Sequence, residues 1–179
     1  MTHDYSEALA LGDRIAILHQ GRIEQVGTPS QVYRRPANRL VAESLGDPPM
    51  NFLAGTITLD QNRSVFTKGS WRIPLPANLR LRAFAGKEVC LGLRPQHLRL
   101  ERARPDTPFS LPSKLFVQEL LGDHSVTSVA VGDHLFMAFC EADQAYSLDE
   151  PLYLAWTPEH MYLFLEETGE TLLAEGTDG

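Results

Sequence analysis

The sequence is poor in cysteine and contains no long apolar segment. Its 179 residues include two cysteines, Cys90 and Cys140, and both lie in apolar, strand-like runs. So low a count argues against a disulfide framework, and we expect two buried free thiols rather than a disulfide. No apolar run approaches the roughly 18–20 residues that a membrane-spanning helix requires. The first residues are polar, unlike a secretory signal. These absences favour a cytoplasmic protein.

Positive charge is concentrated in the middle of the chain, and the last part has almost none. Residues 54–104 contain ten Lys and Arg against three Asp and Glu, whereas residues 105–179 contain one Lys and fourteen acids. These stretches either complement each other, within one domain or across a dimer, or form two separately solvated faces. The basic stretch lacks interleaved aromatic residues and the net charge is −7. Together these features predict no nucleic-acid partner.

The first fifty residues predict a small α+β piece. Thr28, Pro29 and Gln31 form a capping-box pattern with proline at the first helical position, which is typical of a helix start. Asp4 followed by Glu7 is a similar start signal for an earlier, short helix. The expected elements are a helix at 4–12, a hairpin with strands at 13–18 and 22–26, and helices at 28–35 and about 37–45.

From Phe52 onward the pattern changes to short strands separated by turns. The proline-containing linker Asp47-Pro48-Pro49 precedes this change, so we place a domain boundary there, with domains at 1–50 and 51–170. Short strands at this spacing are typical of a small barrel or sandwich. Residues 102–112 are expected to form a connecting loop, and residues 171–179 a frayed tail. The strands are expected at 53–59, 64–66, 71–73, 88–93, 98–101, 113–121, 124–131, 134–138, 151–156 and 161–166.

The β part contains one internal repeat. Residues 91–100 and 154–163 share a strand, a proline, Gln or Glu, a histidine and a leucine at the same spacing. Each proline removes a backbone donor, so the strand must turn a corner there. Two related half-units of one barrel would explain the repeat, and chance similarity between two strand corners is the alternative.

The repeat supplies most of the candidate site residues. His97 and His160 occupy equivalent positions and could meet as a metal pair, but no Cys or acid spacing supports metal, so we favour structural hydrogen bonding. Arg94 either binds an anion or a partner carboxylate, or forms an ion pair that orders the barrel. With Glu159, these are the candidate regulatory or partner-binding residues. Taken alone, His3 fits a surface histidine beside a helix cap better than a catalytic histidine. We predict no metal site.

Several segments together resemble a known family. Thr2-His3-Asp4, the run from Gly12 to Leu18 and the run from Gln20 to Pro29 resemble the switch-histidine region of ATP-binding-cassette ATPases. The stretch from Val32 to Leu53 is similar to the sugar- and glycerol-phosphate-importer branch, which includes the maltose-importer ATPase. The repeat and the segment Val117–Asp123 resemble the transport-associated (TOBE) OB-type regulatory domain of that branch. The resemblance covers nearly the whole chain and implies a mainly β fold, with an OB-type β-barrel after a small α+β piece.

The resemblance also implies a function. His3 would be the switch histidine that contacts the ATP γ-phosphate in the complete domain, where ATP and Mg²⁺ are the cofactors. The parent would be a peripheral ATP hydrolase at the cytoplasmic face of the plasma membrane, working with permease subunits to import a sugar or sugar-phosphate-like solute. This chain would supply its regulatory portion, which forms a homodimer through the barrel and offers a docking face for a regulatory protein.

The sequence also departs from that family. Tyr5 replaces the usual glutamine, and the chain lacks the G-x-x-x-x-G-K-[ST] phosphate loop, the Walker B acids and the signature motif. We therefore expect no ATP hydrolysis and no bound cofactor for this chain alone, and we interpret it as the C-terminal part of a longer subunit. A different class of function, a small-ligand barrel that senses oxyanions, is the alternative.

Overall fold

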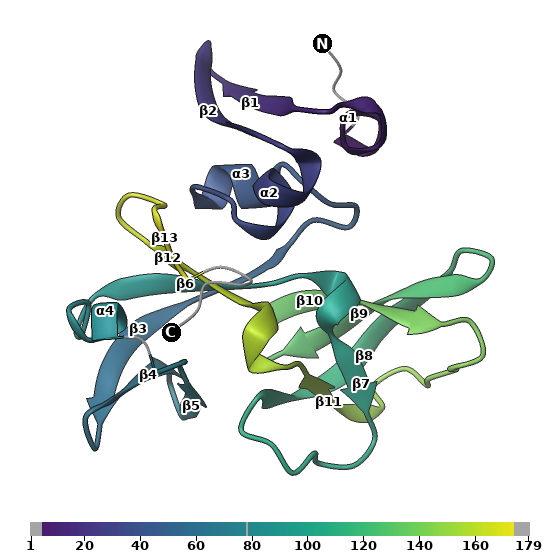
Figure 1. The fold of residues 1–179 in the computed structure, drawn as a ribbon. Coiled ribbons are helices and arrows are strands. Elements are labelled where there is room, and N and C mark those ends of the chain that lie inside the picture. Colours follow the sequence, from purple (N-terminus) through teal and green to yellow (C-terminus); the bar gives the residue numbers. More distant parts are fainter. Residues whose placement is uncertain (1–4, 78, 174–179) are drawn as a thin grey trace.

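The structure is a computed structural model that describes residues 5–77 and 79–173 (Figure 1). The described N-terminal piece consists of three short helices and one hairpin, and it stacks above the two sheets of the β part. Among the described residues, no helix is long and apolar enough to cross a membrane. In chain order the piece contains α1 (Tyr5–Leu11), β1 (Ile15–His19), β2 (Arg22–Gly27), α2 (Pro29–Arg34) and α3 (Arg39–Glu43).

The β part is built from two antiparallel sheets. The six-stranded sheet has the order β13-β12-β6-β3-β4-β5, and the five-stranded sheet has the order β10-β9-β8-β11-β7. The first comprises β3 (Asn51–Asp60), β4 (Arg63–Lys68), β5 (Trp71–Pro74), β6 (Glu88–Leu93), β12 (Met161–Leu165) and β13 (Thr171–Leu173). The second comprises β7 (Arg99–Glu101), β8 (Ser110–Leu120), β9 (His124–Val131), β10 (His134–Glu141) and β11 (Pro151–Ala155). A short helix, α4 (Leu79–Arg82), follows β5.

One hydrophobic core joins the two sheets. Phe66 and Leu91 from the six-stranded sheet share a buried cluster with Val129 and Phe136 from the five-stranded sheet. Asn51 adds a polar link, because its amide donates to the carbonyls of Leu93 and Met137 (3.1 and 2.9 Å) and accepts from the Met137 N–H (2.7 Å). Burial of apolar area between curled sheets is therefore the main stabilising contribution, as the strand pattern predicts.

The sequence predictions agree with most of this architecture. The mainly β class is confirmed, and Cys90 and Cys140 are buried free thiols as expected. The capping box is confirmed too, since the Thr28 side chain accepts from the Gln31 N–H and the Gln31 side chain accepts from the Thr28 N–H.

Two expectations about loops were wrong in part. Residues 110–112 belong to β8 and not to the proline-rich loop. At Pro112 this strand pairs only with β11, so the side of the proline that lacks an N–H donor can face the unpaired edge. Residues Thr171–Leu173 form β13 on β12, so the frayed tail that we expected from 171 does not begin there. Residues 174–179 lie outside the described part of the chain.

The internal repeat corresponds to two crossings between the sheets. β6 leads through the 3₁₀ turn η1 (Pro95–His97) into β7, and β11 leads through η2 (Pro158–His160) into β12. The pairing follows an approximate two-fold relation. In the repeat, Leu91 corresponds to Leu154, and Leu100 corresponds to Leu163. Leu91 pairs with Leu163 across the strands, and Leu154 pairs with Leu100, so the two-fold relation exchanges the two pairs. The two corners therefore occupy equivalent places in the barrel, as expected for two related half-units.

Candidate regulatory site at the repeat corner

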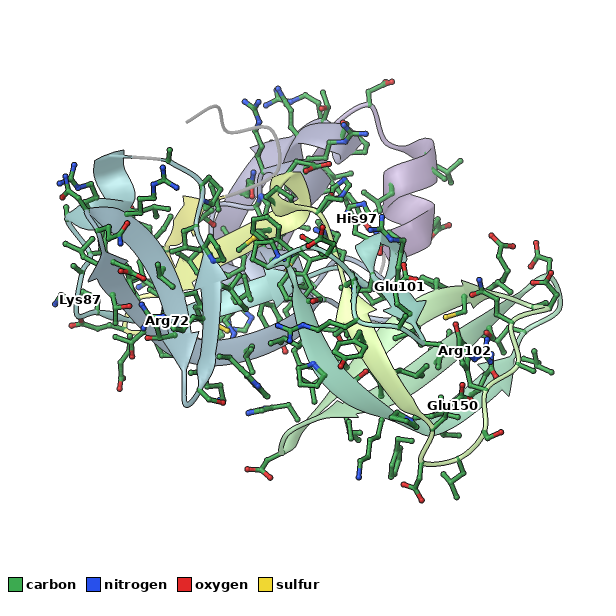
Figure 2. All side chains as sticks on the ribbon, turned by 90° about the horizontal axis from the view of Figure 1, so that it is seen from below. Arg72, Lys87, His97, Glu101, Arg102 and Glu150 are labelled. Atoms are coloured by element: carbon green, nitrogen blue, oxygen red, sulfur yellow. The ribbon has the colours of Figure 1, made fainter. Side chains whose placement is uncertain are left out.

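The candidate residues gather where the two crossings meet, beside the N-terminal piece. Arg94 and Thr157 precede the two 3₁₀ turns in extended conformation, and each carbonyl accepts the turn's hydrogen bond, from His97 N (3.0 Å) and from His160 N (3.1 Å). Proline at the first position of each turn fixes φ and requires no donor there. In Figure 2, His97 lies next to the purple N-terminal elements, whereas Arg102 and Glu150 lie together on the green five-stranded sheet.

His97 and His160 stack on each other near the approximate two-fold axis. Their ring centroids are 3.8 Å apart and the ring planes are inclined by 25°. His160 also shares a hydrogen bond between its Nδ1 and the Thr157 hydroxyl (3.0 Å). Imidazole lone pairs lie in the ring plane, so two nearly parallel stacked rings aim them side by side and not at one metal ion. The geometry therefore agrees with a structural role for this pair better than with a metal pair.

Glu159 lies on the exposed outer side of the same corner. Its own backbone N–H and the Thr157 hydroxyl lower the pKa of its carboxyl group. A negative charge is thus held at the start of a turn, where exposed N–H groups favour it. The described residues contain no group of three or more His, Cys, Asp or Glu that could hold a metal ion.

Arg94 is the most deeply buried of the candidates, with 1% of its surface exposed. Its Nη1 donates to the Leu45 carbonyl (2.8 Å) and its Nη2 to the Tyr33 carbonyl (2.6 Å). The guanidinium carbon lies 3.7 Å from the centre of the Tyr33 ring and 5.4 Å from that of Tyr162. Within the described residues its Nε has no hydrogen-bond partner.

These contacts differ from both sequence interpretations of Arg94. Its partners are carbonyl oxygens and aromatic faces instead of an anion or a carboxylate, and a side chain this buried is not accessible to a partner protein. The residues that hold it were not recognised as site residues in the sequence. No local pattern connects Tyr33 or Leu45 to Arg94, about fifty or more positions away.

His3, the other candidate, lies outside the described residues, as does Asp4.

Comparison with known proteins identifies the domain families of the β part. A family model described as the MalK OB fold domain matches residues 46–98, and one described as the TOBE domain matches residues 91–164. Residues 46–164 of this chain thus belong to the MalK OB fold and TOBE domain families. The OB-type barrel expected from the sequence is thereby confirmed, and the two models overlap at the first repeat corner.

Curated relatives resemble more of the chain than these two domains. The sn-glycerol-3-phosphate import ATP-binding protein UgpC of Yersinia enterocolitica is 32% identical over 170 residues, covering 94% of this chain and 46% of the relative. The sn-glycerol-3-phosphate import ATP-binding protein UgpC 1 of Rhizobium johnstonii is 36% identical over 173 residues, covering 96% of this chain and 45% of the relative. The uncharacterized ABC transporter ATP-binding protein YurJ of Bacillus subtilis is 31% identical over 178 residues, covering 96% of this chain and 48% of the relative.

The chain thus spans about half the length of the curated relatives it matches. The OB-type barrel and these relatives together support a C-terminal regulatory part of an ABC importer. Among solved structures, the cytoplasmic molybdate-binding protein ModG superposes with a TM-score of 0.53 at 13% identity, covering 63% of this chain and 94% of ModG. At that identity the likeness concerns the fold alone.

Proposed function

We propose that this chain is the regulatory and dimerising portion of an ATP-binding subunit that drives ATP-dependent import of a sugar or sugar-phosphate-like solute. In this proposal residues 1–50 complete the nucleotide-binding domain and residues 51–170 form the regulatory barrel. The parent contacts membrane permease subunits and lies at the cytoplasmic face of the membrane through them.

The observation that carries the proposal is the exposed apolar surface of the N-terminal piece. Leu11 is 79%, Leu18 54% and Ile23 64% exposed, on a short helix and on a hairpin of only two strands. An isolated two-stranded hairpin is marginally stable in water, and it gains stability by packing against further strands or helices. A larger α/β domain, such as the nucleotide-binding domain of the relatives, would cover these side chains.

ATP and Mg²⁺ do not fit the residues present in this chain. It has no phosphate loop, and the described residues hold no acidic or histidine cluster for a cation. We therefore assign ATP, Mg²⁺ and hydrolysis to the remainder of the parent, with His3 as the proposed switch histidine there. The sequence of the gene upstream of Met1 tests this directly. A phosphate-loop motif in the same reading frame supports the proposal, and its absence there contradicts it.

For the homodimer, the outer face of the five-stranded sheet offers an apolar surface. On β10 and β8, Leu135 is 57% and Val117 40% exposed. Residues paired directly across strands share one face of a sheet. Ser128 of β9 pairs with Met137 on one side and with Val117 on the other, so Met137 and Val117 lie on the same face. Leu135 lies two positions from Met137 and so faces the same side. A two-fold dimer buries the same surface of both subunits, so a single apolar patch on this face can form such an interface.

Sedimentation equilibrium of the chain over a hundredfold concentration range tests the dimer. We expect a reversible dimer, and we expect the double variant Val117→Asp, Leu135→Asp to shift it to monomer. Leu59→Asp is the matched control for each of the two single variants, because Leu59 is 48% exposed on the other sheet and the substitution adds the same single charge. A strict monomer at every concentration would rule the dimer out.

For a regulatory protein, we propose the exposed side of the repeat corner around Glu159, where His97 and His160 hold the two turns together. Charge reversal of Glu159 would weaken binding of such a regulator and leave dimerisation unchanged, and unchanged binding would contradict this assignment.

The oxyanion-sensing alternative has the fold of ModG in its favour, whereas Arg94, the residue first considered as its anion partner, is enclosed by carbonyl oxygens. Calorimetric titration with molybdate separates the two functions. We expect no binding heat, and saturable binding would favour the sensor.

A further inference from the structure

The segment from Tyr33 to Gly46, here called the junction, connects the N-terminal piece to the barrel. It contains the end of α2, the loop 35–38 and α3. From the sequence, Asp47-Pro48-Pro49 suggests a linker between two separate domains. The contacts of the junction point to a different relation between them.

On the barrel side, Arg94 reaches into the junction from the first repeat corner. Its two hydrogen bonds end on the Tyr33 and Leu45 carbonyls, so one side chain holds both ends of the junction. Gly46, which has a φ of 128°, lies close enough that an added Cβ would be 3.6 Å from Nη1 of Arg94. A buried guanidinium must keep its acceptors, because losing them leaves an uncompensated charge in an apolar site. Separation of junction and barrel would create that situation.

A second contact is made by β13, the edge strand that the sequence did not predict. The Thr171 hydroxyl donates to the Pro36 carbonyl (2.6 Å), and the Thr171 N–H to the Ala37 carbonyl (3.3 Å). The Arg39 N–H donates to the Gly169 carbonyl (2.8 Å), and the Arg39 side chain forms an ion pair with Glu166. Ala42 of α3 also packs into a buried cluster with barrel residues such as Tyr162.

The N-terminal hairpin binds the same short loop from the other side. Gln25 of β2 donates from Nε2 to the Arg35 carbonyl (2.9 Å) and accepts from the Ala37 N–H (2.7 Å). Asn38 donates to Glu24 (2.9 Å). Ile15 of β1 shares a buried cluster with Val41. The loop 35–38 therefore has hydrogen bonds to the hairpin and to β13 at neighbouring backbone groups, which leaves it little freedom to act as a hinge.

We infer that Arg94 is a positioning residue that clamps the junction to the barrel, so that the N-terminal piece and the barrel turn as one rigid body. This inference rests on the proposed function for its consequence: a movement of the nucleotide-binding domain would reach the regulatory barrel directly, without loss in a flexible linker. Arginine suits the role because its planar fork binds two acceptors at once and stacks on Tyr33, which lysine cannot reproduce.

Distances between spin labels in the complete chain test the clamp. Labels on Arg22→Cys in the hairpin and Lys87→Cys in the barrel, which lies outside the proposed dimer face, report the relation of the two parts, since both positions are exposed while the native thiols are buried. We expect a single narrow distance distribution for the parent chain and one at least about twice as wide for Arg94→Met. Arg94→Lys is expected to lie between them. Amide hydrogen exchange of Arg94→Met shows whether the variant is folded. We expect β6 and β12 to stay protected, while the exchange rates of residues 33–46 rise about tenfold or more.

The control is Arg72→Met, which removes an equally charged side chain from an exposed ion pair with Asp60 and should change neither measurement. Thr171→Val removes one donor to the junction without entering the core, and it should broaden the distribution too. If Arg94→Met does not fold, Thr171→Val decides. A narrow distribution in the folded variants, or a broad one in the parent chain, would overturn the clamp. Neither result bears on the dimer, whose own failure would show in sedimentation.

Discussion

Replacing Gly55 by alanine should destabilise the barrel strongly, although it adds only one methyl group. Gly55 lies in β3, opposite Val89 of β6. A Cβ built there would lie 2.6 Å from Cε2 of Phe66, even closer to its Cζ, and 2.7 Å from the Thr67 carbonyl oxygen. The Phe66 ring is fully buried and the Thr67 oxygen belongs to the backbone, so neither can move away freely.

The expected size follows from overpacking. At an unhindered site the exchange of glycine for alanine stabilises a protein by about 0.4–1 kcal/mol. Extra methyl groups in a packed core cost about 1–3 kcal/mol, and the backbone contact places Gly55→Ala near the upper end. For a chain of this length we expect the midpoint of thermal unfolding to fall by roughly 5–10 °C.

A double-mutant cycle with Phe66→Leu, followed by circular dichroism in urea, tests the cause. The smaller side chain should relieve part of the clash, giving a coupling free energy of about 1–2 kcal/mol between the two positions. Additive effects, or a Gly55→Ala variant as stable as the parent, would refute the reasoning.

Three further predictions concern single groups. Thr28→Ala removes the cap of α2 and should cost about 1 kcal/mol in urea unfolding, whereas Thr28→Ser keeps the cap and should cost little. Asn51→Leu leaves the part-buried Met137 N–H without its acceptor and should cost about 1–3 kcal/mol in the same assay; a neutral result would contradict the role of Asn51 in closing the sheets. Burial raises the pKa of the Cys90 thiol to about 11, from a reference value of 9.0. The raised pKa means that the folded state favours the protonated thiol. The contribution of Cys90 to the free energy of unfolding is therefore complete below pH 9 and is lost as the pH rises to about 11. Urea unfolding at several pH values should show a shallower decline for Cys90→Ala, and parallel curves would contradict it.

Local patterns in the sequence predicted the local elements well. The Thr28 capping box and the two proline corners were recognisable because each depends on residues within four positions of each other. The strands of the barrel followed from alternation and turn residues. The repeat also indicated that His97 and His160 are equivalent, and the structure places their rings in contact.

Contacts between distant segments were not predictable in the same way. β13 is three residues long and exists through pairing with β12 and the bonds of Thr171 to Pro36 and Ala37, none of which leaves a local pattern. Arg94 was recognised as important, yet its acceptors are backbone carbonyls, and any residue type supplies those. The sequence could therefore identify the residue without identifying its role.

The two-fold pairing at the repeat corners has a consequence for how the chain folds during synthesis. β6 lies in the interior of the six-stranded sheet between β3 and β12, and Leu93 pairs with Met161 much later in the chain. While a ribosome is still making residues 94–160, one edge of β6 has no partner strand, and unpaired apolar edges promote aggregation. Pairing over such sequence separations is slow. The barrel must therefore close after translation has nearly finished, and nascent chains that stall before β12 should be the ones that chaperones retain.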